Sequence, residues 1–351
     1  TAYEIGVRLV GSEMCIRDRG IDGGASKVLT QLFTINKNNE IIDQSEPFEQ
    51  SYKDVDTFNH QFIPVPLNTQ NEEMNNENYK IGFNEKGQSK VIIKAIIESI
   101  KYFNNKNISF IGFCFPGLKT ENLDCISVMA NGPRNLEMLI VINKKIASEL
   151  GPFVKINKIY DDSLSCVLGE KFCHDGKLKN CSNAIYIGGG TGIADGILFN
   201  DRILDLKIEP QIKKSWQIKM ENGDSIEECF SLSGLCKKWN DKKPNSIELL
   251  NDLFNKAIKK DRIAMQILED EGKAFHLLIK SRIKFFEFEG KYPEKIVIGQ
   301  RMGQILNEKN HPLKSVINKY NVKDIPLELS LNRNTAALGA AQSAIHEDNV
   351  K

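Results

Sequence analysis

The sequence lacks any apolar run that approaches the roughly 20 residues a helix needs to span a bilayer, so we expect no membrane segment. It also lacks a basic block: 47 Lys and Arg oppose 46 Asp and Glu, for a formal charge of +1, which argues against nucleic acid or a membrane surface as partner. The eight cysteines include no Cys-x-x-Cys pair, and several lie in apolar runs, which favours buried free thiols in a reducing compartment over disulfides. These absences predict a cytoplasmic protein that handles a small molecule.

Metal binding has one weak candidate in the sequence. Cys173-His174 together with Cys181 could be a fragment of a metal site, but no second pair of ligands lies nearby. No zinc is therefore predicted.

The length of 351 residues is large for a single hydrophobic core and indicates two lobes. The first 19 residues carry too many charges for a signal peptide and show no clear helical period. Within them, the run Gly11-Ser-Glu-Met-Cys-Ile-Arg-Asp-Arg19 resembles a translated sequencing-adapter artefact seen at the ends of assembled reading frames. We expect residues 1–19 to be non-native or disordered and the natural protein to begin near Gly20.

A glycine-rich stretch at residues 186–199 organises the rest of the chain. One apolar run enters the cluster Gly188-Gly-Gly-Thr-Gly192 and a second, at 193–199, leaves it, which predicts a strand, a tight turn and a strand. Glycines allow positive φ and close approach of the backbone, so that successive N–H groups can point at one anion such as a phosphate. A glycine-rich hairpin without a ligand explains this stretch equally well on its own.

A second glycine turn follows Gly20. The segment Asp22-Gly-Gly-Ala-Ser-Lys27 precedes an alternating strand at 28–35. Its carboxylate can hold a hydrated magnesium ion, while the N–H groups and the Ser26 hydroxyl take phosphate oxygens. The alternative is a plain β-turn with Asp and Gly in favoured positions.

Two adjacent carboxylates, Asp161 and Asp162, follow a predicted strand at 154–159 and precede a predicted helix at 163–172. Ligands in α/β folds sit at the carboxyl ends of strands, which makes this pair a candidate base and orienter. The competing interpretation is an Asp that only caps the next helix.

The remaining pattern alternates between strands and helices and indicates the α/β class. A polar region at 41–83 is expected to be a long connection or flap of low order. Further helices are predicted at 89–103, 137–150, 247–288, 305–320 and 334–345, and further strands at 107–115, 124–130, 293–299 and 325–331.

The ordered set of motifs resembles the sugar kinases of the ROK family, within the actin/hexokinase/heat-shock-70 ATPase superfamily, over residues 20–346. Asp22-Gly-Gly-Ala-Ser-Lys27 is similar to the first phosphate motif, and Gly190-Thr-Gly-Ile-Ala-Asp-Gly196 to the second. Asp161-Asp-Ser-Leu-Ser-Cys-Val-Leu-Gly-Glu170 matches the family segment that carries the catalytic base without a gap. Weaker similarities lie at Ile111-Gly-Phe-Cys-Phe-Pro-Gly117, Asn135-Leu136, Ile226-Glu-Glu-Cys-Phe-Ser231, Ile296-Val-Ile-Gly299 and Ala337-Leu-Gly-Ala-Ala341.

The resemblance implies a two-lobed actin-like ATPase fold of the ribonuclease H-like kind, with mixed sheets flanked by helices and a nucleotide cleft between the lobes. It places residues 20–130 and 335–351 in an N-terminal lobe and 131–334 in a C-terminal lobe, and it is compatible with a homodimer. The implied reaction is ATP-dependent phosphorylation of a hexose or N-acetylhexosamine with Mg²⁺, and the implied base is Asp162. Sugar contacts are implied for Asn131, Asn135, Asp161 and Glu227, the metal contact for Asp22, and ATP contacts for Asp22, Gly23, Gly24, Ser26, Lys27, Gly190, Thr191, Gly192 and Gly299.

The departures from the family pattern lie in the same stretches. The Gly-Glu-Ile-Gly-His sugar motif and the zinc knuckle of the family are not recognisable between 202 and 227. Asp195 and Ala194 replace two glycines, and Asp195 would add a negative charge near a polyphosphate unless magnesium or Lys27 compensates it. Gln300 and Arg301 replace glycines beside the adenosine.

These departures keep other functions open. A catalytically silent sugar- or nucleotide-binding regulatory protein of the same fold is the main alternative. A ROK transcription repressor is disfavoured because no helix-turn-helix pattern precedes Gly20, and a BadF-type ATPase because cluster-ligating cysteines are missing. The sequence does not identify the sugar.

Overall fold

The computed structural model describes residues 16–36, 41–103, 108–151, 154–206, 209, 211–244 and 249–348. It divides into two compact units, Thr1–Asp161 with Ala337–Lys351 (unit 1) and Asp162–Ala336 (unit 2). The division therefore falls at Asp161, whereas the sequence analysis expected it at residue 131. Each unit contains one mixed sheet flanked by helices.

The sheet of unit 1 has the order β3-β2-β1-β5-β8, and β4 also pairs with β2. The neighbours of β1 differ in direction, because β2 is antiparallel to it while β5 is parallel. β8 continues the parallel side next to β5. The strands are β1 (Ile16–Gly23), β2 (Lys27–Ile35), β3 (Ile41–Gln44), β4 (Phe48–Ser51), β5 (Ile108–Phe115) and β8 (Ile159–Asp161).

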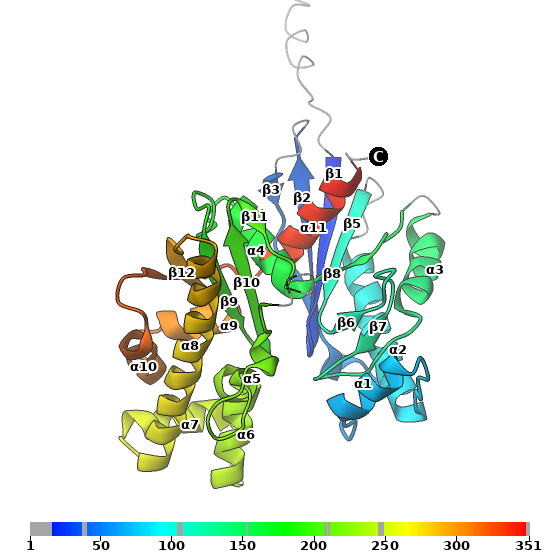
Figure 1. The fold of residues 1–351 in the computed structure, drawn as a ribbon. Helices are drawn as coiled ribbons and strands as arrows, with labels where there is room; N and C mark the ends of the chain where they lie inside the picture. The colour runs from blue at the N-terminus through cyan, green and yellow to red at the C-terminus, as the bar shows by residue number, and fades with distance from the viewer. Residues whose placement is uncertain are drawn as a thin grey trace, which may run out of the picture. The chain divides into compact units, whose positions relative to one another are not determined.

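Helices α2 (Phe83–Tyr102) and α3 (Met138–Leu150) bury their apolar stripes in the core of this unit. Isoleucines at helical spacing along α2, namely Ile92, Ile96 and Ile100, are almost fully buried, as their pattern predicts. The small residues of α11 (Thr335–Asp348) serve a different purpose: Cβ atoms at Gly20 and Gly112 would lie 1.9 and 2.0 Å from backbone oxygens of this helix. The helix therefore packs directly on the backbones of β1 and β5, as the red helix in Figure 1 illustrates.

Region 41–83 is structured, so the expectation of a connection of low order is wrong. It contains β3, β4, the 3-10 helix η1 (Tyr52–Asp54) and α1 (Leu67–Asn75). Strands β3 and β4 satisfy their backbone hydrogen bonds along the edge of β2, which leaves polar side chains free to face water. The polar composition of this region gave no strand signal, because an edge strand needs no apolar run. A two-stranded sheet, β6 (Leu118–Lys119) with β7 (Ile126–Val128), follows β5.

The sheet of unit 2 has the order β11-β10-β9-β12-β13. Its centre is the predicted hairpin, β9 (Ala184–Gly189) with β10 (Ile193–Phe199), flanked by β11 (Arg202–Ile203), β12 (Lys295–Gly299) and β13 (Leu327–Leu329). The helical elements are α4 (Asp162–Phe172), η2 (Ser215–Gln217), α5 (Ile226–Phe230), α6 (Leu232–Lys242), α7 (Leu249–Ile258), α8 (Arg262–Phe288), α9 (Gln300–Asn307) and α10 (Pro312–Tyr320).

The two faces of the β9–β10 hairpin contact different helices. Ile185, Ile187 and Ile197 belong to the apolar core that includes α8. On the opposite face, a Cβ at Gly196 would lie 2.4 Å from Val167 of α4. The alternation of side chains along each strand thus separates a core face from the face that carries α4.

Residues 1–15 lie outside the described residues, but residues 16–19 do not behave as a disordered segment. They belong to β1 and pair with β2, from Ile16 opposite Ile35 to Arg19 opposite Leu32. Arg19 is fully buried, and its three guanidinium nitrogens have no hydrogen-bond partner. Burial lowers the pKa of Arg19 to about 10, which shows how poorly this site suits a cation.

Among the helices that the structure describes, none combines the length and the apolar character needed to cross a membrane.

Candidate functional site

The first glycine turn connects β1 to β2 and is closed by a hydrogen bond of 2.8 Å from the N–H of Gly24 to the carbonyl of Lys27. The buried Tyr52 supports it, because its hydroxyl donates to the Gly24 carbonyl over 2.9 Å and its N–H donates to the Ser26 carbonyl over 3.0 Å. Neither Gly23 nor Gly24 has positive φ, and a Cβ at Gly23 would lie only 2.3 Å from the Phe115 ring. Close packing, not backbone conformation, is what requires glycine at position 23.

The two charged residues of this turn, Asp22 and Lys27, have different surroundings. Burial and the nearby charge of Asp22 raise the pKa of the Tyr52 phenol well above its usual value, so Asp22 lies near the support of the turn. Asp22 itself is partly exposed. Lys27 forms an ion pair with Glu49 of β4.

Of the predicted sugar residues in unit 1, Asp161 lies in β8, and Asn131 and Asn135 lie in the connection between β7 and α3. Asp161 ends β8 opposite Phe115, and its carboxylate is 3.6 Å from the ammonium group of Lys119. Asn135 is only 8% exposed; its side-chain oxygen accepts from the N–H of Glu137 over 3.2 Å, while its side-chain nitrogen has no partner. Asn131 is exposed. Lys119 was not among the sequence predictions, because a single lysine after Pro116-Gly117 carries no motif.

A buried ion network fixes the segment that carries Asn135. The neighbouring Arg134 side chain is fully buried and donates to Glu85 of α2 over 2.8 and 2.9 Å and to Glu73 of α1. Its backbone N–H also donates to Glu85 over 3.0 Å. Helix α1, which lies within the polar region 41–83, and helix α2 therefore position the segment of Asn135, a support that the sequence analysis did not predict.

The second glycine turn is tied to the start of α6. The Gly190 N–H donates to the Gly192 carbonyl over 3.0 Å, the Leu232 N–H donates to the Gly190 carbonyl over 3.1 Å, and the Ser233 hydroxyl donates to the Thr191 carbonyl. Thr191 is exposed. These bonds hold the turn in one conformation.

The glycines of the second turn differ in how much space surrounds them. Cβ atoms at Gly188 and Gly189 would lie 2.8 Å from Gln300 and 2.4 Å from Met302, so these positions require glycine for packing. A Cβ at Gly190 would have no neighbour closer than 3.9 Å. Positive φ occurs at none of the three, so that part of the expectation is wrong, and packing explains the glycines at 188 and 189. The close approach of a phosphate to this turn stays a prediction.

Two carboxylates from separate helices of unit 2 influence each other. Asp162 is the first residue of α4, and Glu227 lies in the first turn of α5. Burial and the negative charges of Asp162 and Asp195 raise the pKa of Glu227 to about 7, and the Ser215 hydroxyl lies 3.5 Å from its carboxylate. Helix α5 begins at a capping box in which Ser225 and Glu228 bond reciprocally, which fixes the orientation of Glu227. A carboxyl group that titrates near neutral pH is able to exchange a proton at physiological pH.

Asp195 faces the core and forms an ion pair there. Its carboxylate, 5% exposed, accepts from the fully buried Arg282 of α8, with Nε at 2.8 Å and a second bond from the other end of the guanidinium. The charge that the sequence analysis expected near the polyphosphate is thus compensated by Arg282, which lies 87 residues away and could not be paired by inspection.

The end of β12 is crowded. A Cβ at Gly299 would lie 2.4 Å from the Tyr186 hydroxyl, and Gln300 adopts positive φ of 55° directly after it. The Gln300 side chain donates to Cys166 of α4 over 3.1 Å and packs beside Gly188. A glutamine therefore keeps the left-handed backbone conformation that favours glycine, and it adds an amide next to the second turn.

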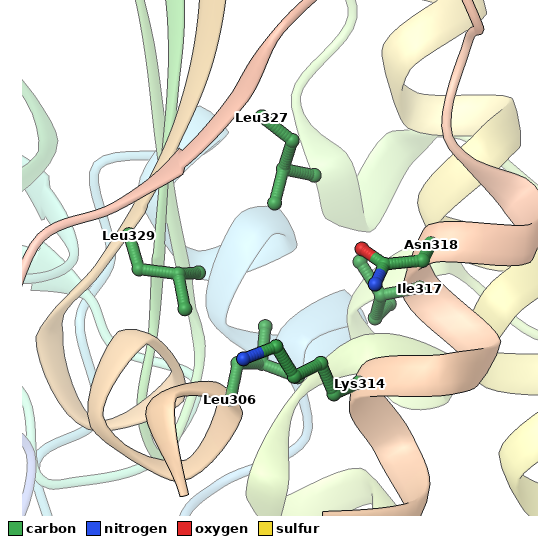
Figure 2. A pocket seen from close by; sticks show the side chains of 6 residues that line it. All are labelled: Leu306, Lys314, Ile317, Asn318, Leu327 and Leu329. Atoms are coloured by element: carbon green, nitrogen blue, oxygen red, sulfur yellow. The ribbon is translucent and has the colours of Figure 1, made fainter. Parts of the chain in front are cut away.

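Within the described residues, no group of three or more His, Cys, Asp or Glu side chains is arranged to hold a metal ion. Unit 2 also has a small hollow between α9, α10 and β13, shown in Figure 2, whose lining includes Leu306, Lys314 and Leu329. None of the predicted site residues lines this hollow.

Sequence comparison finds no protein-family model and no curated protein that matches this chain. Solved structures do match it over nearly its whole length. A ROK hexokinase from Thermus thermophilus superposes with a TM-score of 0.59 at 16% identity, covering 96% of this chain and 100% of that one. A ROK family glucokinase from Streptomyces griseus, in complex with glucose and AMPPNP, gives 0.60 at 13% identity, with 94% and 99% covered.

A transcriptional regulator also matches this chain. A ROK family transcriptional regulator, a homologue of the E. coli MLC protein, gives a TM-score of 0.55 at 15% identity and covers 95% of this chain and 80% of that one. The chain therefore has the two-lobed fold of ROK proteins, as the motif resemblance implied, and this fold is shared by sugar kinases and by regulators.

Proposed function

We propose that the protein transfers the γ-phosphoryl group of ATP to a hydroxyl group of a hexose or an N-acetylhexosamine. The observation that supports this most is the electrostatic coupling of Asp162 and Glu227 at the starts of two helices of unit 2. A carboxyl group whose pKa is raised toward neutrality beside a second carboxylate is typical of a site that moves protons. The ROK fold adds support, because hexokinase and glucokinase structures share it.

In the proposed reaction, Asp162 accepts the proton of the attacking hydroxyl while the new oxygen–phosphorus bond forms and ADP leaves. Glu227, which is mostly protonated below pH 7, donates a hydrogen bond to the sugar and then adds no charge beside the base. Asn131, Asn135 and Asp161 hold the sugar by hydrogen bonds. The two glycine turns hold the nucleotide through Gly23, Gly24, Ser26, Lys27, Gly190, Thr191, Gly192 and Gly299.

Magnesium fits this site through a single carboxylate. Mg²⁺ in phosphotransferases is bound by one or two carboxylates together with phosphates and waters, so a cluster of protein ligands is not required. Asp22, partly exposed beside the first turn, is the residue that would hold it. The ion would neutralise charge on the phosphates when bound.

The proposal predicts that Asp162→Asn loses at least about 10²-fold in kcat, since general base catalysis contributes that much or more. Phosphoryl transfer should be measured by ADP release with a panel of hexoses and N-acetylhexosamines. Thermal unfolding with and without sugar gives the control, because the variant should keep its fold and its affinity for sugar. A wild-type protein that phosphorylates no sugar of the panel would refute the kinase function.

The glycine turn gives a second test. Gly190→Ala adds a methyl group where no protein atom lies within 3.9 Å, so folding should be unaffected while a phosphate approaching the backbone would be obstructed. We expect weaker binding of ATP and an unchanged thermal midpoint. Gly87→Ala, at a helical position of unit 1 with open space, is the matched control and should bind ATP normally.

The pH dependence should report Glu227. Below pH 7 its carboxyl group is neutral, and above pH 7 it gains a charge next to Asp162 and the incoming phosphates. We expect kcat/KM to fall as the pH rises through about 7 in the wild type, and Glu227→Gln to remove this fall because its amide stays neutral.

A catalytically silent binding protein is the second candidate. The position of Gln300 favours it, because this side chain occupies space beside Gly188 of the second turn. In that case the protein would bind sugar without turnover, and Gln300→Gly would increase its affinity for ATP.

A further inference from the structure

Lys119 is a buried cation without a hydrogen bond. Its side chain has no exposed surface, and its ammonium nitrogen makes no hydrogen bond within the chain. The three N–H groups of a lysine normally find acceptors when they are taken out of water, because an unpaired buried donor is costly. Lys119 lies in β6, directly after Pro116-Gly117.

The second buried donor, Asn135, lies on the segment that pairs with β7. Lys119 is paired with Ile126 at an irregular step of the β6–β7 ladder, and Ile126 is bridged in turn to Asn135. Asn135 has its amide oxygen engaged by the Glu137 N–H, so its unpartnered NH₂ end is the one that remains for a ligand.

The Lys119–Asp161 separation leaves the two groups without a direct hydrogen bond to each other. The 3.6 Å between the ammonium nitrogen and the carboxylate is longer than a hydrogen bond, so a ligand oxygen that bonds to both groups would link them. A hydroxyl suits this position because it accepts from the ammonium group and donates to the carboxylate. An ether oxygen or a second carboxylate cannot donate to Asp161.

We infer that Lys119 is a substrate-positioning residue that, with Asp161, recognises one hydroxyl group of the sugar, while Asn135 donates to a neighbouring oxygen. The inference rests on the proposed sugar-binding function, but it needs no phosphoryl transfer. It adds to the site a cation that selects which hydroxyl the protein can accept.

The experiment is a binding cycle. Calorimetric titration of the wild type with glucose, mannose, galactose and N-acetylglucosamine identifies the tightest ligand, and its mono-deoxy analogues are then titrated. One deoxy analogue should bind roughly 10- to 100-fold more weakly than its parent, the loss expected for a hydrogen bond to a charged group. In Lys119→Met, the parent should weaken by a similar factor, and that analogue should bind as well as the parent does.

Unliganded stability separates binding from a structural role. Lys119→Met keeps the length of the side chain and removes an ammonium group that makes no hydrogen bond, so its thermal midpoint without sugar should stay close to that of the wild type. Lys119→Arg should restore part of the discrimination. Lys94→Met, which removes an exposed lysine of the same unit, should change neither affinity nor discrimination.

The outcomes are distinct. Sugar binding without turnover would refute the kinase function and leave the role of Lys119 to be decided by the cycle. Turnover with the same deoxy penalties in Lys119→Met would refute the role of Lys119 alone. A lower thermal midpoint of the unliganded variant would make Lys119 a structural residue, and the absence of any sugar binding would refute both proposals.

Discussion

Three buried arginines, two in unit 1 and one in unit 2, differ in whether a carboxylate lies against the guanidinium group. In the described part of the chain, Arg134 of unit 1 and Arg282 of unit 2 are fully buried and bind carboxylates, whereas Arg19 of unit 1 is equally buried and binds none. A guanidinium group can be removed from water at small net cost only when acceptors replace the lost waters. Arg134 and Arg282 have acceptors that replace the lost waters, whereas Arg19 has none.

Both paired arginines support candidate site residues. Arg134 precedes Asn135 and fixes its segment to α1 and α2, while Arg282 binds the carboxylate of Asp195 in β10, the strand that follows the second glycine turn. Arg19 has no comparable role, and it lies in the run that resembles a foreign sequence. The ion pairs next to the candidate site residues are therefore those of Arg134 and Arg282, in which each buried guanidinium group has a carboxylate partner.

The largest effect is expected for Arg134→Met, which leaves two carboxylates without their cation. Removal of one partner of a buried pair typically costs about 3–5 kcal/mol of unfolding free energy. Hydrogen exchange should also show faster opening of the segment around Asn135. Methionine keeps most of the apolar stem, so an effect under about 1 kcal/mol would mean that the network is already hydrated.

Arg282→Met should cost a similar or slightly smaller amount, about 3 kcal/mol, because a single carboxylate is left unpaired. Both tryptophans, Trp216 and Trp239, lie in unit 2, so urea unfolding followed by tryptophan fluorescence reports this unit. The double variant Asp195→Leu, Arg282→Met should recover most of the loss. A double variant as unstable as the single one would show that the pair is not the cause.

Arg19→Val should act in the opposite direction and stabilise unit 1 by about 2–3 kcal/mol, since it removes an unsatisfied buried charge from a strand that favours valine. Thermal unfolding followed by far-UV circular dichroism measures the gain. Arg202→Val, which changes an exposed arginine in a strand of unit 2, should give no comparable gain. A destabilised Arg19→Val would contradict the comparison.

The smallest effect concerns Glu271, a fully buried carboxyl group of α8 whose two oxygens have no hydrogen-bond partner. Burial raises its pKa well above the usual 4.5, so the folded chain keeps a proton that the unfolded chain has lost. The contribution of this proton to stability is complete below pH 4.5 and is lost as the pH rises toward the raised pKa.

Glu271→Gln should therefore stabilise unit 2 by about 1–2 kcal/mol at neutral pH and by less at pH 4. The difference in urea midpoint between variant and wild type, followed across this pH range, measures the effect. An advantage that does not grow with pH would show that the carboxyl group is not the titrating residue.

Much of the architecture follows from local patterns. Alternation and glycine punctuation correctly predicted the β9–β10 hairpin and β12, and the apolar pattern predicted α2 and α3, because these elements bury a regular apolar face. The run of small residues predicted α11. The strand before Asp162 is shorter and later than expected, at Ile159–Asp161, because isolated lysines interrupt its apolar run. The elements of 41–83 escaped prediction because their stability comes from pairing with β2 and from contacts of α1.

The sequence by itself determined the order of motifs, the alternation of strands and helices, and the adjacency of Asp161 to Asp162. Only the tertiary structure decided which charges are satisfied: Arg282 reaches Asp195, Arg134 reaches Glu73 and Glu85, Asp162 acts on the pKa of Glu227, and Lys119 approaches Asp161. The reason is that the cost of a charge depends on burial and on partners distant in the chain, and neither is encoded by neighbouring residues.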